Sequence, residues 1–210
     1  MPFAKKSETE NGIAGIWELT DSVEQLRKNF NFTRNEKTEF GQLKNEKRKK
    51  EYLAVRLLTE KLLDKKPDIH YRKAGNPYLK NHTLNISISH SAELITVFLS
   101  EKIAGIDAEN IFRNTEKITR RFLSDSEFKT TTQSNNRQLA FVMYWSAKEA
   151  IFKCASVQNV NFKNQIRVFP FSIKNEGQLR GSLKTEKDFR NFDLWYFFYG
   201  NNVIVYCVEE

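Results

Sequence analysis

Two stretches of helical periodicity, one in each half of the chain, constrain the fold most strongly. The first runs from about Leu43 to Leu63 and stops before Pro67, and the second runs from about Arg137 to Cys154. Short strand patterns follow each helix. The sequence therefore predicts an α+β fold of two pseudo-equivalent halves, each with antiparallel strands packed on a long helix. The core face of the second helix is predicted to contain Leu139, Met143, Ala147, Ala150 and Cys154.

The strand patterns predict two hairpins. Residues 84–89 alternate apolar and polar side chains and are followed by the apolar residues 94–99, and we expect the strand around residue 107 to extend this pair into a meander. Residues 192–199 and 203–208 flank Gly200 and form the second predicted hairpin. With a boundary near Ala104, the halves are residues 1–103 and 104–210. The other expected elements are strands at 13–19, 165–173 and 178–183 and a helix near 115–122.

Composition indicates a protein with a substantial core. The chain has 210 residues, of which 40% are hydrophobic, and a mean hydropathy of −0.60 with no long apolar run, so we expect no membrane span. Residues 1–12 lack the apolar stretch of a secretory signal. The two cysteines, Cys154 and Cys207, have neither the spacing of a metal site nor the number needed for a disulfide framework. So few cysteines are typical of a protein from a reducing compartment. We expect a cytoplasmic monomer.

Two short acidic motifs provide the main indication of chemistry. In Gly-Ile-Asp-Ala-Glu at residues 105–109, Asp107 and Glu109 lie on one face of a strand, because strand side chains alternate. In the second helix, Glu149 and Lys153 are one turn apart. Carboxylate oxygens suit Mg²⁺, whereas zinc is disfavoured because no His or Cys accompanies them. Taken alone, each pattern is more typical of solvated surface charge than of a metal site.

Four blocks in order resemble the signatures of the 4′-phosphopantetheinyl transferases of the long, surfactin-synthetase-activating type. They are Asn-Ile-Ser-Ile-Ser-His-Ser at 85–91, the Gly-Ile-Asp-Ala-Glu motif, Arg-Phe-Leu-Ser-Asp-Ser-Glu at 121–127 and Trp-Ser-Ala-Lys-Glu-Ala-Ile-Phe-Lys at 145–153. The resemblance implies two related halves with the active site between them. It also implies transfer of phosphopantetheine from coenzyme A to a serine of an apo acyl or peptidyl carrier protein, with release of 3′,5′-ADP.

The resemblance assigns a role to each acidic residue. Asp107, Glu109 and Glu149 would bind the Mg²⁺ that contacts the coenzyme A pyrophosphate; since Ala108 is apolar, the third carboxylate must be Glu149. Glu149 would also be the general base for the serine, directly or through a water on the metal. Lys153 would stabilise pyrophosphate charge in the transition state.

Further residues are expected to contact coenzyme A or to support the site. His90 would contact a phosphate, and Glu127 would orient Lys153. The family usually has Gly-Lys-Pro where this chain has Gly-Asn-Pro at 75–77, so one cation near the nucleotide is missing, and Arg72 or Lys73 could compensate. The full set of expected coenzyme A contacts is Arg48, Arg56, Asn76, Ser89, His90 and Lys153.

Positive charge is concentrated in the first half. Residues 41–75 contain eleven Lys or Arg against five acids, which gives +6 of the net charge of +8. Such a field suits nucleic acid, an anionic cofactor or an acidic protein. Two rival functions remain: a nucleic-acid-binding protein that uses the basic helix, and a metal-dependent phosphohydrolase that uses the same acids. The short, trimeric carrier-protein synthase is a third alternative, but a chain of this length that holds both halves argues against it. The chain has no zinc, helix-turn-helix or RNA-recognition signature, which argues against nucleic acid as a partner. The resemblance implies coenzyme A and a carrier protein as the partners, with no nucleic acid and no membrane.

Overall fold

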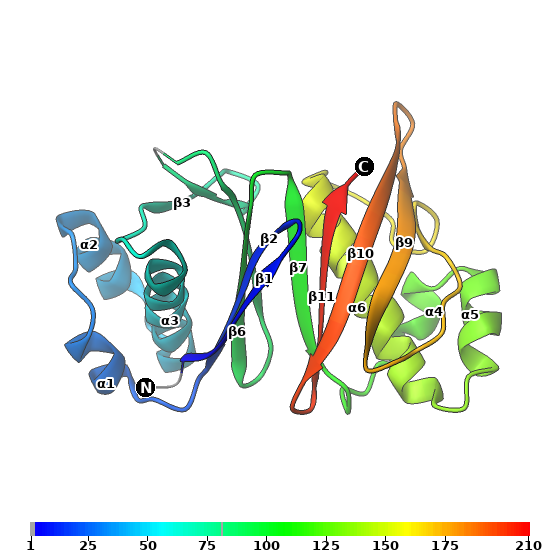
Figure 1. Cartoon of the computed structure of the whole chain (residues 1–210), viewed down its shortest axis with the longest axis horizontal. Coiled ribbons are helices and arrows are strands. Elements are labelled where there is room, and N and C mark those ends of the chain that lie inside the picture. The colour runs from blue at the N-terminus through cyan, green and yellow to red at the C-terminus, as the bar shows by residue number, and fades with distance from the viewer. Residues whose placement is uncertain (1–2, 81) are drawn as a thin grey trace.

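In the computed structural model, which describes residues 3–80 and 82–210, two antiparallel sheets lie side by side between flanking helices (Figure 1). Met1 and Pro2, the start of the predicted N-terminal half, lie outside the described residues. The first sheet has the strand order β1-β2-β6-β5, the second has the order β7-β11-β10-β9-β8, and β3 and β4 form a separate pair. The predicted α+β class is therefore confirmed.

The first half packs the long helix α3 on the four-stranded sheet. Leu53 and Leu58 of α3 are fully buried in a cluster that also contains Trp17 and Ile95 from the sheet. The Asn45 side chain accepts a hydrogen bond from the third amide of the helix and caps it, so α3 begins three residues later than predicted. The elements are β1 (Phe3–Thr9), β2 (Gly12–Glu18), α1 (Val23–Lys28), α2 (Arg34–Gln42), α3 (Glu46–Leu63), β3 (Ile69–Tyr71), β4 (Pro77–Leu79), β5 (Asn85–His90) and β6 (Leu94–Ser100).

The second half packs the long helix α6 on the five-stranded sheet. A side chain at Gly105 of β7 would lie 2.0 Å from the Ala150 carbonyl oxygen, so only glycine allows α6 to approach this strand so closely. The predicted core face of α6 is buried, apart from Leu139, which is partly exposed. The elements are β7 (Ala104–Asn110), a 3₁₀ turn η1 (Glu116–Ile118), α4 (Thr119–Phe122), α5 (Asp125–Thr132), α6 (Arg137–Ala155), β8 (Ile166–Val168), β9 (Glu176–Lys184), β10 (Phe189–Tyr199) and β11 (Asn202–Glu209).

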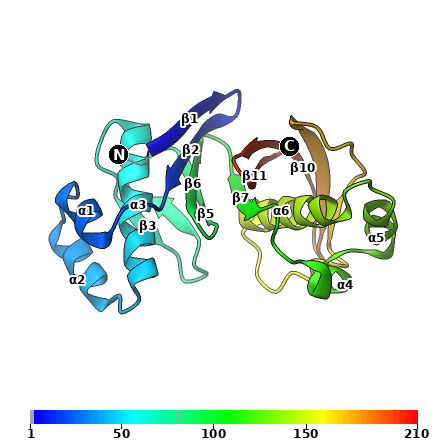
Figure 2. The same ribbon diagram turned by 90° about the horizontal axis from the view of Figure 1, so that it is seen from below.

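The two sheets also bury apolar side chains against each other. Their faces turned away from α3 and α6 share one core cluster, so the molecule has a helix, two sheets and a second helix in succession (Figure 2). This arrangement brings β5 and β7, the edge strands of the two sheets, next to each other. The shared cluster includes Ala14, Ile16, Phe98, Ile106, Ala108 and Ile204.

Both predicted hairpins are confirmed, but the predicted meander is wrong. Strand β5 pairs with β6, and β10 pairs with β11. Strand β7 pairs with β11, not with β6, because its apolar face completes the core between the sheets. The strand expected at 165–173 is limited to β8, and the helix expected near 115–122 is a 3₁₀ turn followed by α4. Strands β1, β3 and β4 and helices α2 and α5 were not predicted, because their sequences are short or strongly polar.

Among the residues that the structure describes, no helix combines the length and the apolar character that crossing a membrane requires. The longest helix, α6, is buried against the second sheet along most of one side.

Candidate active site

Asp107 is buried on β7, beneath α6. Its Oδ1 atom accepts hydrogen bonds from Lys153 Nζ at 2.7 Å and Ser89 Oγ at 2.9 Å. Its Oδ2 atom accepts one from Ser146 Oγ at 2.9 Å. The predicted alternation along β7 is confirmed, since the residues on either side of Asp107 face the other sheet. Three donors, one of them from the N-terminal half, thus surround one carboxylate.

Lys153 lies in the last turn of α6 and reaches across to β7. Besides Asp107, its Nζ atom donates to Ser89 Oγ at 2.9 Å and to the Ile106 carbonyl oxygen at 3.0 Å. The side chain remains 27% exposed, and these three acceptors use all three N–H donors of the ammonium group, so an incoming anion would interact with its positive charge instead of an unused donor.

Glu109 is held by an aromatic and a cationic partner. Its Oε1 atom accepts a hydrogen bond from Trp145 Nε1 at 2.8 Å and forms an ion pair with Arg113, whose guanidinium lies over the Trp145 ring. Burial and the Asp107 charge raise the pKa of Glu109, and Arg113 opposes this shift. Trp145 therefore does more than pack, because it donates to this carboxylate.

Glu149 lies one helical turn before Lys153. Burial and then the charge of Asp107 raise the pKa of Glu149 to about 7, with a further increase from Glu109 and a decrease from Lys153. A carboxyl group with this pKa exchanges protons readily at neutral pH, which suits a general base.

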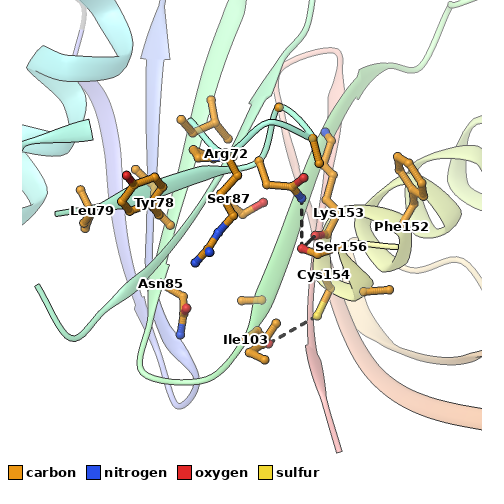
Figure 3. Close-up of a pocket in the computed structure, with 18 of the residues that line it drawn as sticks. Arg72, Tyr78, Leu79, Asn85, Ser87, Ile103, Phe152, Lys153, Cys154 and Ser156 are labelled. Atoms are coloured by element: carbon orange, nitrogen blue, oxygen red, sulfur yellow. Dashed lines mark hydrogen bonds between the residues drawn. The ribbon is translucent and has the colours of Figure 1, made fainter. Parts of the chain in front are cut away.

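A cavity of about 710 Å³ opens beside Lys153, between the two halves (Figure 3). Its walls come from β4 and β5 in the first half and from the end of α6 in the second, and no acidic residue lies among its described lining residues. Asn76 donates a hydrogen bond to Ser156 Oγ at 3.0 Å, which links the halves across the cavity. Arg72 lines the wall, whereas Lys73 does not. The lining of the cavity therefore suits an anionic ligand.

Comparison with known proteins identifies the family. A family model for the 4′-phosphopantetheinyl transferase superfamily matches residues 103–207, which is half of the chain. The chain belongs to this superfamily. The matched segment runs from β7 to β11 and includes Asp107, Glu109, Glu149 and Lys153.

Among solved structures, this superfamily member resembles the crystal structure of the holo-[acyl-carrier-protein] synthase of Thermotoga maritima. The sequence identity is 19% and the TM-score is 0.41, and the match covers 51% of this chain and 62% of that one. The chain thus matches less than two thirds of the length of that synthase. No curated protein sequence matches the chain.

The predicted magnesium ligands of the transferase-superfamily site lie near one another but are not assembled. Within residues 3–80 and 82–210, no three carboxylate, histidine or cysteine side chains are close enough to form a ready metal-binding group. Asp107 and Glu109 are instead occupied by Lys153 and Arg113. Burial, followed by the charge of Asp107, raises the pKa values of Glu109 and Glu149, so negative charge on these two carboxylates is unfavourable without a cation. The donor chemistry therefore fits a hard divalent cation, which would balance this negative charge.

The pKa of Glu149 predicts a pH-dependent metal affinity. A proton on this carboxyl group competes with the metal, so Mg²⁺ affinity of the free protein should fall as the pH decreases through 7, approaching about tenfold per pH unit below it. Calorimetric Mg²⁺ titration at a series of pH values measures this dependence. Glu149→Gln should bind more weakly with a flatter pH profile, and equal slopes in both proteins would contradict the assignment.

His90 and Ser89 differ in their availability to a ligand. Partial removal from water lowers the pKa of His90, Glu51 opposes this shift, and Lys153 and Arg48 strengthen it. His90 would therefore offer a phosphate a hydrogen bond instead of a positive charge. Ser89 is buried, and its hydroxyl is hydrogen-bonded to groups of the second half. Contrary to the expected contact with coenzyme A, it does not face the cavity.

The two arginines expected at the nucleotide do not line the cavity. Arg48 is exposed and pairs with Glu51 at 2.8 Å, close to His90. Arg56 is 2% exposed, lies 3.5 Å from the centre of the Tyr52 ring and faces the carboxylates of Glu36 and Glu39. A spacing of eight residues puts both arginines on one face of α3, but α2 covers the Arg56 end of that face. The expected contact between Arg56 and coenzyme A is therefore corrected to a structural role.

Glu127 does not orient Lys153, contrary to the sequence prediction. Its Oε2 atom accepts from Lys148 Nζ at 2.8 Å, and its Oε1 atom accepts from the Val168 amide at 2.9 Å. Lys148 is completely buried, and its three N–H donors are shared among the Glu127 carboxylate and three backbone carbonyl oxygens. Sequence reasoning missed Lys148 and Ser146, although both lie inside the Trp-Ser-Ala-Lys-Glu block, because helical spacing alone does not show which neighbour each side chain meets.

Proposed function

We propose that the chain transfers the 4′-phosphopantetheine group of coenzyme A to a serine of an apo acyl or peptidyl carrier protein, acting as a monomer with Mg²⁺ and releasing 3′,5′-ADP. The single observation that supports this most is the Lys153–Asp107 pair beside a large inter-half cavity whose described lining has no acidic residue. Family membership agrees with it. Lys153 and Arg72 lie in a cavity lining that has no acidic residue, and this combination favours binding of the coenzyme A phosphates. The neighbouring carboxylates favour a divalent cation.

Each polar residue has a defined part in this proposal. Lys153 binds the pyrophosphate and stabilises its increasing charge in the transition state. Glu149 accepts the proton of the carrier serine, directly or through a water molecule. Asp107, Glu109 and Glu149 hold Mg²⁺, which would neutralise phosphate charge and stabilise the leaving group. His90 donates a hydrogen bond to a phosphate, and Asn76 and Arg72 contact the nucleotide in the cavity.

A transfer assay tests the proposal directly. Incubation with coenzyme A, Mg²⁺ and an apo carrier protein should add the mass of one phosphopantetheine group to the carrier and release 3′,5′-ADP in equal amount. A chelator should abolish the reaction, and added Mg²⁺ should restore it. Full activity in chelator would contradict the metal assignment. Hydrolysis of coenzyme A without carrier modification would favour the phosphohydrolase, and salt-sensitive RNA or DNA binding without transfer would favour the nucleic-acid-binding rival.

The basic start of α3 should attract the carrier protein. Lys47 and Arg48 lie near His90, and the family's carrier domains present an acidic helix beside the modified serine. Replacing Lys47, Lys49 and Lys50 with Gln should raise KM for the carrier by about tenfold at low salt, with little change for coenzyme A. Steady-state kinetics at several salt concentrations measures this, since the difference should fade as the Debye length falls to about 8 Å.

A matched control removes the same charge from a remote strand. Lys174, Lys184 and Lys187, all changed to Gln, lie near the ends of β9, three strands away from β7 in the second sheet. An equal rise in carrier KM for both triple variants would show that net charge, and not the start of α3, controls the encounter.

A further inference from the structure

Two serines join the edge strands of the two sheets. The edge strands β5 and β7 belong to different sheets, and serine side chains of β5 supply acceptors for amides of β7. Ser87 Oγ accepts from the Ile106 amide at 3.0 Å, and Ser89 Oγ accepts from the Ala108 amide at 3.3 Å. Because the two serines are two residues apart on one strand, they point to the same side. We name this pair of contacts the serine seam.

The two serines of the seam differ in what else they contact. Among the described residues, Ser87 Oγ has no hydrogen-bond partner besides the Ile106 amide. Ser87 also lines the cavity (Figure 3). Ser89 Oγ also accepts from Lys153 Nζ at 2.9 Å and donates to Asp107 Oδ1 at 2.9 Å. A hydroxyl group has one proton and two lone pairs, so all the hydrogen-bonding capacity of Ser89 is used. It has none left for a phosphate.

The contacts of Ser89 fix the geometry of two residues of the proposed machinery. Lys153 and Ser89 converge on Oδ1 of Asp107, while Ser146, which is fully buried, donates to Oδ2. A carboxylate with donors on both oxygens cannot rotate freely. Because Ser89 comes from the first half and its partners come from the second, the orientation of Asp107 depends on how the two halves meet.

We infer that Ser89 is a positioning residue that orients Asp107 and Lys153 across the serine seam. This inference rests on the proposed function. It assigns to Ser89 an indirect role through Asp107 and Lys153 in place of a contact with coenzyme A. Groups that orient metal-binding carboxylates in this way typically change metal affinity or activity by about 10- to 100-fold when they are removed.

The test compares Ser89→Ala with Ser87→Ala. Each variant removes one bond of the serine seam from a buried position, with 4% and 6% exposure respectively, so the loss of the seam contact itself is matched between the two variants. Only Ser89→Ala also removes the bonds to Asp107 and Lys153. We expect it to lower kcat and the Mg²⁺ affinity of the free protein by about 10- to 100-fold more than Ser87→Ala does. Ser89→Thr, which keeps the hydroxyl group, should recover most of the loss.

Three measurements separate the outcomes. If Ser89→Ala raises KM for coenzyme A and leaves kcat unchanged, Ser89 contacts the substrate. If the two alanine variants have equal Mg²⁺ affinities, Ser89 does not orient Asp107. Either result overturns the inference. Should Ser89→Ala fail to fold, Ser89→Cys keeps the volume and weakens the donor. Amide exchange should accelerate at Ala108 in the Ser89 variant and at Ile106 in the Ser87 variant. Mg²⁺ affinity and exchange need no transfer activity, so they decide the inference even if the proposed function fails.

Discussion

Replacing Lys153 with Met is expected to lower kcat for phosphopantetheine transfer by about 10²- to 10³-fold, the effect of removing one preorganised electrostatic partner of a developing negative charge. The fold should persist, because the Lys153 side chain is 27% exposed and Asp107 keeps its bonds to Ser89 and Ser146. Steady-state kinetics and a separate measurement of coenzyme A binding, by calorimetry, test this expectation.

Two results would show a different role for Lys153. If coenzyme A binding weakens while kcat at saturation is unchanged, Lys153 binds the ground state and transition state equally well. Lys153→Arg is the matched variant that keeps the charge but replaces the compact ammonium group with a planar fork. We expect Lys153→Arg to be considerably more active than Lys153→Met. If both variants lose the same activity, the exact position of the ammonium group is essential and a positive charge alone is not sufficient.

Replacing Lys148, five residues earlier on the same helix, is expected to reduce stability instead. Lys148→Met leaves the Glu127 carboxylate buried without its counter-charge and three backbone carbonyls without a donor. Removing one partner of such a pair costs about 3–5 kcal/mol of unfolding free energy. For a chain of this size that corresponds to a decrease in Tm of roughly 6–20 °C. Urea unfolding followed by circular dichroism measures the change.

A double variant distinguishes the ion pair from simple loss of packing. Glu127→Gln in the Lys148→Met background removes the uncompensated charge and should recover part of the lost stability. Loss of less than about 1 kcal/mol in Lys148→Met, or no recovery in the double variant, would contradict the structural role. In the same experiments Lys153→Met should lower the unfolding midpoint less than Lys148→Met does, because Lys153 is 27% exposed and Asp107 keeps donors from Ser89 and Ser146.

The local chemistry of the site could be read from short patterns. Strand alternation placed Asp107 and Glu109 on one face, and helical spacing placed Glu149 and Lys153 one turn apart; the structure has both arrangements. The two hairpins were predictable for the same reason, because their strands are adjacent in the chain. Each of these features depends on residues that are neighbours in sequence, where backbone geometry fixes the relation between side chains.

Contacts between distant segments could not be predicted in this way. The pairing of Glu127 with Lys148, the covering of Arg56 by α2 and the pairing of β7 with β11 all depend on which surfaces meet when the core closes. Burial selects these contacts, because a charge removed from water requires whichever partner the packing brings close. Sequence spacing contains no information about that partner.

The sequence by itself determined the α+β class, the two long helices, the acid pairs and the resemblance to the transferase family, since all of these follow from periodicity and short motifs. Only the tertiary structure decided that Lys148 stabilises the fold while Lys153 meets Asp107, and that Ser89 connects both halves to that pair. The physical reason is that the site lies where two edge strands from different sheets come together, and that junction forms only when apolar faces from both halves are buried against each other.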